Sequence, residues 1–340
     1  VYNRAEAKAV VTANPQSFLA IDRAETQFGD EVDIYDERVY AKAHEMLSDW
    51  IDNGSFVRDT QNAYYIYELT MDGRVQTGIV ACASIDDYAN NIIKKHENTR
   101  ADKEADRIHH VDTCSAQTGP IFLAYRTNPI IGEVVAAVKQ TPALYDFVAD
   151  DGIRHRVFKI GDATQIKAIQ NAFAGIDDIY IADGHHRAAS AVKVGFKRRE
   201  EHPDYDGTEE FNYFLSVLFP DEELMIMDYN RVVRDLNGMS KEQFLAKMNE
   251  LFNVTEIGGM IGGSITESDV RPGKKGDFAM FINDKWYRCS MKPSDIPDDP
   301  VEGLDVSVLQ NLLLSPVLGI GDPKTDKRID FVGGIRGLTE

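Results

Sequence analysis

Cysteine is scarce in this sequence, and the few cysteines follow no recognisable pattern. The chain has 340 residues but only three cysteines, Cys82, Cys114 and Cys289. They are odd in number, far apart and without Cys-x-x-Cys spacing, which excludes a disulfide framework and a cysteine-based zinc site. A reducing compartment fits this composition, and we expect the protein to be cytoplasmic.

Long hydrophobic runs are also missing. No apolar stretch in the chain approaches the roughly 18 residues that a membrane-spanning helix requires. The sequence also shows no signal peptide, with its charged start and short apolar core. We therefore expect no membrane among the partners of this protein.

Positive charge is in deficit. The chain carries 37 Lys and Arg against 56 Asp and Glu, which gives a net charge of −19. A protein that binds a nucleic acid duplex needs a basic face to neutralise phosphates, so we expect no nucleic acid partner. The one short basic run, Lys197-Arg198-Arg199, is followed directly by Glu200 and Glu201, which is typical of a solvated helix end.

The centre of the chain, in contrast, concentrates hydrogen-bond donors in one stretch, Ile179–Ala191, which reads IYIADGHHRAASA. Ile179–Ala182 is apolar and β-prone, and the small residues after the polar turn favour a helix. We expect this helix to continue to Val194 and to stop at Gly195. The stretch therefore predicts a strand, a tight turn and a helix.

The turn itself predicts a phosphate site. The first turn of a helix has unpaired N–H groups and a positive dipole end. Gly184 lets the backbone approach a ligand closely, while His185, His186 and Arg187 add donors suited to phosphate. We expect Gly184, His186 and Arg187 to bind a cofactor phosphate and His185 to be a catalytic candidate. Asp183 either caps the helix or acts as a base or metal ligand.

A second polar cluster lies upstream. We expect a helix that starts at Asp86 and continues through the polar run from Lys94 to Arg107, and the simplest interpretation of that run is a solvated surface. At helical offsets of 3, 7, 10 and 11 residues from His96, however, stand Thr99, Lys103, Asp106 and Arg107. Most of these side chains would share one helix face and could complete a phosphate or carboxylate pocket. Glu97 beside them is a candidate general base.

The remaining pattern predicts an α+β fold in three parts. Residues 1–55 are mostly helical, with a short strand at Ser17–Ile21. Residues 56–235 are rich in strands, and Met71–Arg74 contains the Asp-Gly pair of a tight hairpin. Residues 236–340 form an accessory lobe, with a hairpin about Asn283-Asp284.

The chain also resembles known families. Asp183–Arg187 looks like the ligand-binding turn of the ParB/sulfiredoxin superfamily, in which a Gly-x-x-Arg-type turn at a helix start holds nucleotide phosphates. Nearly end to end, the chain resembles the bacterial family known as domain of unknown function 1015. The motifs that carry this likeness are Asn14–Leu19, His96–Thr99 with Lys103, Asp106 and Arg107, the central turn, Asp299–Asp305, and Asp326–Gly334.

This resemblance implies a ParB/sulfiredoxin-like mixed-sheet core in residues 56–235 that binds a nucleotide, ATP, ADP or CTP, together with Mg²⁺. Related activities are kinases that phosphorylate free L-serine, so the implied substrate is a small amino acid. The resemblance also supports His96, Thr99 and Arg107 as cofactor ligands, and Asp183 or Glu97 as the base. Relatives extend beyond both ends of this chain, so we expect terminal pieces to be missing.

One alternative function remains open, a non-catalytic ParB-like nucleotide-binding switch or regulatory adaptor, as in partition proteins, although no clear helix-turn-helix is present. A sulfiredoxin-like reductase is disfavoured, because that chemistry needs a cysteine at the position that His185 occupies here. The oligomeric state has no indication in the sequence.

Overall fold

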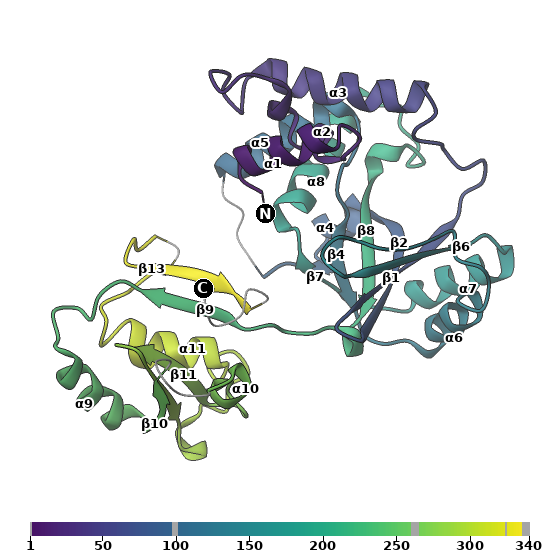
Figure 1. The fold of residues 1–340 in the computed structure, drawn as a ribbon. Helices are drawn as coiled ribbons and strands as arrows, with labels where there is room; N and C mark the ends of the chain where they lie inside the picture. Colours follow the sequence, from purple (N-terminus) through teal and green to yellow (C-terminus); the bar gives the residue numbers. More distant parts are fainter. Residues whose placement is uncertain (1, 97–100, 260–264, 324, 335–340) are drawn as a thin grey trace. The chain divides into compact units, whose positions relative to one another are not determined.

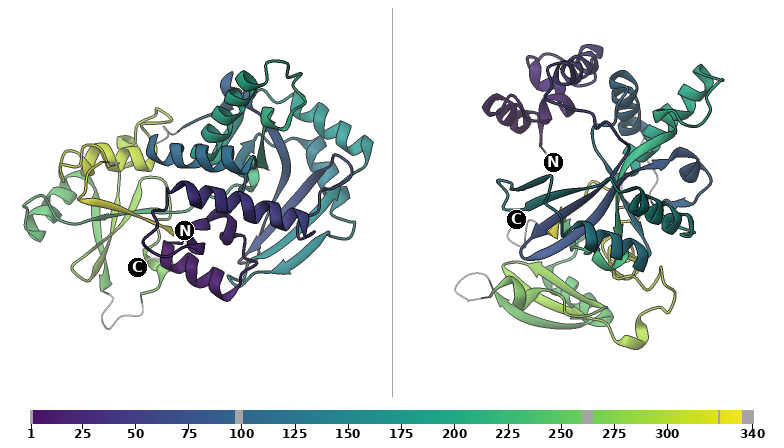
Figure 2. Two further views of the ribbon diagram at one scale, coloured as in Figure 1. Left: turned by 90° about the horizontal axis from the view of Figure 1, so that it is seen from above. Right: turned by 90° about the vertical axis from the view of Figure 1, so that its right-hand side faces the viewer.

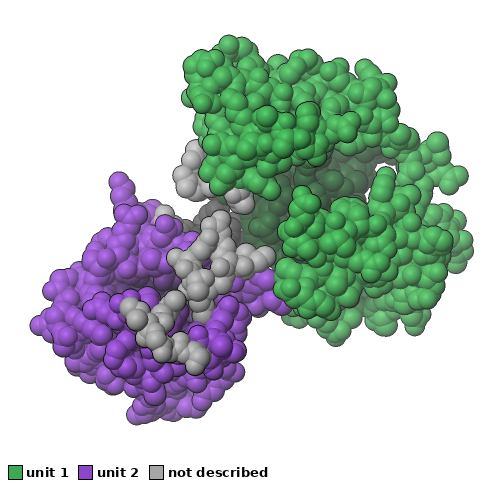
Figure 3. Space-filling view, in the orientation of Figure 1, with its two compact units in different colours: residues 1–224 green, residues 225–340 purple. Residues whose placement is uncertain are grey.

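The structure is a computed structural model that describes residues 2–96, 101–259, 265–323 and 325–334. The chain divides into two compact units, 1–224 and 225–340 (Figure 3). The segment 1–55 belongs to the first unit, and the second unit begins ahead of the expected position 236. Among the described residues, no helix has both the length and the apolar character needed to cross a membrane.

An eight-stranded mixed sheet forms the centre of the first unit, with the order β3-β7-β4-β8-β2-β1-β6-β5. Its strands are β1 (Tyr64–Met71), β2 (Arg74–Ser84), β3 (Ile93–Lys94), β4 (Ile121–Tyr125), β5 (Tyr145–Val148), β6 (Arg154–Ile160), β7 (Ile179–Asp183) and β8 (Tyr213–Pro220). The pairs β3–β7 and β4–β8 are parallel, and the other neighbours are antiparallel. With helices packed around this sheet, the fold is α+β, as predicted.

The predicted hairpin between β1 and β2 is present. Asp72 and Gly73 have φ angles of 52° and 78°, so both central residues of the turn are left-handed. This geometry matches the twist of the flanking strands and explains the Asp-Gly pair. The sheet then buries Ile66 of β1 against Phe158 of β6 and Phe214 of β8, all at most 1% exposed.

Helices of the first unit surround the sheet and one another. They are α1 (Arg4–Ala13), α2 (Leu19–Asp22), η1 (Ala24–Gln27), α3 (Glu37–Asp52), α4 (Ile85–Ala89), α5 (Ala101–Cys114), α6 (Pro129–Val138), α7 (Ala163–Ala174), α8 (His185–Glu201), η2 (Glu210–Asn212) and η3 (Asp221–Glu223). α5 packs on α8, and α3 packs on α5, which Figures 1 and 2 show from three sides. The long helix α8 therefore lies between the sheet and the N-terminal helices.

The strand predicted at Ser17–Ile21 is wrong, because Leu19–Asp22 forms the short helix α2. Ala20 and Ile21 are fully buried there, next to α3. The four apolar residues from Phe18 to Ile21 form too short a run for periodicity to separate a strand from a buried helical turn. Tertiary packing therefore determines the helical conformation of this segment.

The single helix expected from Asp86 through Arg107 is also wrong. α4 ends at Ala89, and Asn91 has a φ of 59°, a left-handed conformation that an α-helix cannot continue through. Ile93 then enters the sheet as part of β3 and is buried. His96 consequently lies after β3 and does not share a helix face with Arg107, which lies on α5.

Gly195 does not end α8, which continues to Glu201. A Cβ atom at Gly195 would overlap the carbonyl oxygen of Phe211 and lie 2.8 Å from Cδ1 of Ile85. The glycine therefore permits close packing of α8 against η2 and α4, and it does not end the helix.

The second unit has a separate hydrophobic core, built around Phe244, Met248 and Tyr287. Its elements are β9 (Tyr229–Val233), α9 (Lys241–Leu251), β10 (Asn253–Gly259), α10 (Glu267–Val270), β11 (Asp277–Ile282), β12 (Lys285–Ser290), η4 (Pro293–Asp295), α11 (Asp305–Leu309), the π-helix η5 (Gln310–Leu314) and β13 (Ile329–Gly333). β9 pairs with β13, and β10, β12 and β11 form a three-stranded sheet. The hairpin expected at Asn283-Asp284 is confirmed, with φ angles of 46° and 62°.

Candidate functional site

The predicted strand, turn and helix are present at the centre of the first unit. β7 ends at Asp183, Gly184 has φ 94° and ψ 28°, and α8 begins at His185. This left-handed conformation is one that a side chain at Gly184 would strain. The glycine is thus required for the chain to pass from the sheet into α8.

The N-terminus of α8 differs from those of the other long helices whose first turns are described. In those helices a side chain caps the first turn by accepting a backbone N–H, and the capping residues are Asn3, Asp36, Asn128, Asp162 and Ser240. At α8 the N-cap is Gly184, which has no side chain to accept a bond. No side chain at the N-cap therefore competes with an external acceptor for the first turn of α8.

Arg187 is held firmly at this turn. Its Nη2 donates to Oδ2 of Asp183 at 2.9 Å, and its Nη1 donates to the carbonyl oxygen of Pro120 at 2.7 Å. A Cβ at Gly184 or Gly119 would lie 3.1 Å or 3.2 Å from the guanidinium, so two glycines make room for it. Asp183 therefore does not cap the helix; its carboxylate, 75% exposed, orients Arg187.

His96 and His185 meet although 89 positions separate them in the sequence. The backbone N–H of His96 points to Nε2 of His185 at 3.5 Å, and the two rings contact edge to face with centroids 4.3 Å apart. The parallel pairing of Ile93 with Ile179 positions His96 beside the start of α8. His185 is only 6% exposed, so the contact fastens the end of β3 to the start of α8.

His186 presents a ring nitrogen with unmet hydrogen-bonding capacity. Its Nδ1 is buried and has no hydrogen-bond partner among the described residues. Its main-chain carbonyl accepts from Oγ of Ser190 at 2.7 Å, within α8. Because buried polar atoms are nearly always paired, an unpaired ring nitrogen at a helix start is a candidate ligand contact.

Within the described part of the chain, Arg107 is connected to the turn through Asp22 and Thr118. Its Nη1 lies 3.3 Å from Oδ1 of Asp22, and Oγ1 of Thr118 donates to the same oxygen at 3.2 Å. Thr118 is followed by Gly119 and Pro120, which contact Arg187. Asp22 thereby ties α2, α5 and the loop before β4 into one network beside the turn.

Sequence reasoning missed the loop Thr118–Pro120 and its partner Asp22. The Gly119-Pro120 pair is a turn signal in the sequence, but such a pair does not indicate which distant residue the turn contacts. Two predicted residues, Glu97 and Thr99, lie outside the described residues, so their roles stay predictions. The proposed roles of Asp183, His185 and the phosphate ligands also stay predictions, although the structure brings most of these residues together.

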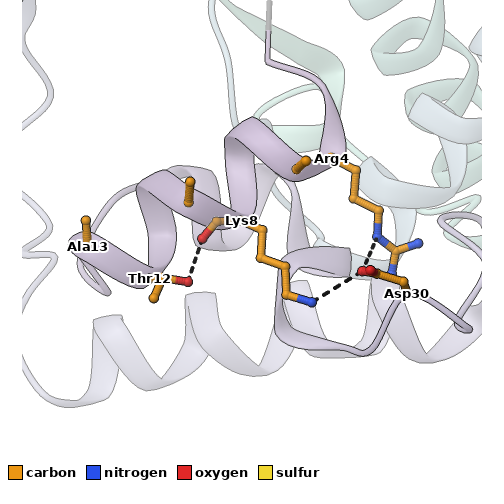
Figure 4. Close-up of a pocket in the computed structure, with 7 residues that line it drawn as sticks. Arg4, Lys8, Thr12, Ala13 and Asp30 are labelled. Carbon is orange, nitrogen blue, oxygen red and sulfur yellow. Dashed lines mark hydrogen bonds and ion pairs between the residues drawn. The ribbon is translucent and has the colours of Figure 1, made fainter.

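A separate hollow lies on the surface of α1 (Figure 4). Its floor is formed by alanine side chains, and its charged groups already pair with one another. Nζ of Lys8 lies 3.3 Å from Oδ1 of Asp30, and Nε of Arg4 lies 3.9 Å from the same oxygen. This hollow offers less for binding a ligand than the turn does.

Comparison with known proteins gives one match. The family model described as "Protein of unknown function (DUF1015)" matches residues 1–307. No curated protein matches the chain, and no solved structure does. Because the matched region contains the sheet, the turn and most of the second unit, the chain belongs to the DUF1015 family.

Proposed function

We propose that this protein binds a nucleotide through the turn at Gly184 and transfers a phosphoryl group to a small free hydroxyl compound. One observation carries the proposal: the start of α8 lacks a capping side chain and instead presents His186 and Arg187 beside Gly184. Such a helix start binds phosphate through its N–H groups, its dipole and its basic side chains.

Phosphoryl transfer depends mainly on positioning and on cationic groups around the moving phosphate. Arg187 supplies such a cationic group, and its hydrogen bond to the carbonyl oxygen of Pro120 fixes the orientation of the guanidinium before the ligand binds. The ring of His186, whose Nδ1 has no partner among the described residues, would turn toward the phosphate to add a further contact. The backbone N–H groups in the first turn of α8 would hold the remaining phosphate oxygens.

Asp183 is the carboxylate at the turn and the first candidate for the base. Its side chain is 75% exposed and lies 2.9 Å from Nη2 of Arg187, beside the helix start where the phosphate would bind. The acceptor hydroxyl would pass its proton to Asp183 as the new O–P bond forms. The P–O bond to the departing nucleotide breaks in the same transfer. Glu97 is the alternative base.

A divalent ion would neutralise phosphate charge during such a transfer. Among the described residues, no three His, Cys, Asp or Glu side chains group closely enough to hold a metal ion. This donor set fits Mg²⁺ that arrives with the nucleotide and keeps phosphate and water ligands, with Asp183 as the available carboxylate.

L-Serine is the favoured acceptor, on the strength of the resemblance to the free-serine kinases of the ParB/sulfiredoxin superfamily. The test is to incubate the protein with Mg²⁺, L-serine and ATP, ADP or CTP in turn, and to follow O-phosphoserine by mass spectrometry. Asp183→Asn and Glu97→Gln are assayed beside the wild type. Loss of product in one variant that keeps the nucleotide affinity of the wild type identifies the base, because Asp183 also orients Arg187.

Two other outcomes would change the proposal. Nucleotide binding without product, across a panel of small hydroxyl compounds, would favour a non-catalytic switch or regulatory adaptor. Turnover that survives both substitutions would keep the phosphotransferase but remove Asp183 and Glu97 as bases.

A further inference from the structure

A second cavity lies along α8, beyond the turn. It has a volume of about 560 Å³ and is bounded by α8, the C-terminal end of α5, β2, β8 and the chain around Arg58 and Glu210. The first α8 residue in its wall is Ala191, four positions and thus about one helical turn after Arg187. None of the turn residues lines it, so it is a separate site within the first unit.

The wall of this cavity is mostly apolar and built of small side chains. Ala191, Val194 and Gly195 of α8 face Cys82 of β2 and Leu215 of β8. The volume falls within the range of small-molecule pockets, roughly 300–1,000 Å³. Such a wall accommodates a bulky apolar group.

Most polar groups at the cavity are already used by the protein. The guanidinium of Arg198 bonds Oδ1 of Asp112 at 2.8 Å and Oγ of Ser115 at 3.3 Å. The amide of Gln117 donates to the carbonyl of Tyr213 at 3.0 Å and accepts from the backbone N–H of Leu215 at 2.5 Å. Because these groups already have protein partners, they form a fixed part of the cavity wall.

Arg58 and Glu210 are different, because they bond each other and remain highly exposed. Nη2 of Arg58 lies 3.0 Å from Oε1 of Glu210, and the side chains are 86% and 83% exposed. An ion pair this exposed contributes at most about 1 kcal/mol, so its members can exchange partners readily. The cavity thus places one exposed cation and one exposed anion beside an apolar wall.

We propose that this cavity binds a free α-amino acid with a large apolar side chain. The ligand's carboxylate would bond Arg58, its ammonium group would bond Glu210, and its side chain would pack on Val194 and Leu215. The charges of a zwitterion match this pair, whereas a simple carboxylic acid would leave Glu210 facing a like charge. This inference does not depend on the proposed phosphotransfer.

Calorimetry with L-leucine and L-phenylalanine tests the ligand class. Both should bind saturably, and L-serine should bind more weakly because it leaves the apolar wall uncovered. N-acetyl-L-leucine and L-leucinamide each lack one charge, and each should bind at least about tenfold more weakly, as expected for a lost charge-assisted hydrogen bond.

Cys82 provides an independent report of the site. It is the exposed cysteine of the three and lines the cavity, whereas Cys114 and Cys289 are buried. Saturating L-leucine should slow alkylation of Cys82 by iodoacetamide several-fold, as followed by peptide mass spectrometry. Prior labelling of Cys82 with N-ethylmaleimide should abolish L-leucine binding.

Matched variants separate the proposal from general effects. Arg58→Gln and Glu210→Gln should each weaken L-leucine binding about tenfold without lowering the melting temperature. Arg271→Gln removes the ion pairs of Arg271 with Glu267 and Asp228 in the second unit and should leave binding unchanged. Arg187→Ala should also leave it unchanged, so failure of the nucleotide proposal is distinguishable.

Two results would overturn the inference. One is the absence of both binding and Cys82 protection with L-leucine and L-phenylalanine at millimolar concentration. The other is protection of Cys82 by adenosine but by neither amino acid, which would identify the cavity as a nucleobase site.

Discussion

Nη2 of Arg187 lies 2.9 Å from Oδ2 of Asp183, across the glycine that separates β7 from α8. The pair couples the principal cation of the turn to the carboxylate beside it. A phosphate that binds at the start of α8 must share Arg187 with Asp183 or displace it. Because the bond from Arg187 to Pro120 can persist in either case, the guanidinium keeps its place when the ligand arrives.

Arg187→Ala should weaken nucleotide binding by about 1.5–3 kcal/mol, the range for a charge-assisted hydrogen bond. Titration calorimetry with ATP, ADP and CTP measures the change. Arg154→Ala is the matched control, because Arg154 forms an equally short pair with Asp146 at the far edge of the sheet. Equal nucleotide affinity in the wild type and Arg187→Ala would place the nucleotide elsewhere.

Gly184→Ala should destabilise the protein by about 1–2 kcal/mol, because alanine at a φ of 94° is strained. It should also weaken nucleotide binding, since the new Cβ would lie 3.1 Å from Nη2 of Arg187 and displace the guanidinium. Thermal unfolding and calorimetry measure the two effects separately.

Gly207→Ala controls for the strain in that experiment. Gly207 has a φ of 95°, and a Cβ atom added to it would meet nothing within 4 Å. Alanine there is also strained by a positive φ, but it stands in open space. The two variants should lose similar stability, but only Gly184→Ala should lose nucleotide affinity. Parallel losses of affinity would mean that Gly184 acts through stability alone.

The turn could be predicted from sequence because its determinants are local. An apolar strand, a glycine and a helix-forming run follow one another directly in Ile179–Ala191, so periodicity and turn chemistry were sufficient. The Asp72-Gly73 hairpin was predictable for the same reason, since two neighbouring residues set its backbone.

The surroundings of the turn could not be predicted, because they depend on pairing between distant segments. His96 reaches His185 only through the parallel pairing of β3 with β7, and a two-residue strand leaves almost no periodic signal. Arg187 likewise finds Pro120, 67 residues away, through the pairing of β4 with β7. The helical spacing of the sequence predicts that His96 and Arg107 share one helix face. In the structure the left-handed conformation of Asn91 follows the end of α4, so His96 and Arg107 do not lie on one continuous helix.

Gly195→Ala should destabilise the protein by roughly 1–3 kcal/mol, the usual cost of overpacking. Alanine normally stabilises a helix interior relative to glycine, but here its Cβ would overlap the carbonyl oxygen of Phe211. Gly132→Ala in α6 is the matched control, because a Cβ atom there would meet nothing within 4 Å. It should raise stability by up to about 1 kcal/mol. A gain in melting temperature for both variants would show that α8 and η2 can separate freely.

Glu68→Gln should strongly destabilise the first unit at neutral pH. Glu68 is 1% exposed, its Oε1 accepts from Nε of Arg156 at 2.7 Å, and its Oε2 pairs with Lys139. Removing one partner of a buried ion pair costs about 3–5 kcal/mol, because the remaining charges lose their counterion. Asp146→Asn, in an exposed pair of the same sheet, should leave the unfolding midpoint nearly unchanged.

The loss in Glu68→Gln should also depend on pH in one direction. Burial alone would raise the pKa of Glu68, but the bonds from Lys139 and Arg156 outweigh it and lower the pKa below its usual value. A carboxyl group with a lowered pKa in the folded state stabilises the fold above its unfolded pKa of about 4.3. This contribution disappears as the pH falls through the lowered folded value. Urea unfolding from pH 7 to pH 3 should therefore show a constant difference between wild type and variant down to about pH 5 and a shrinking difference below it. A difference that grows on acidification would mean that the folded protein holds Glu68 in its protonated form.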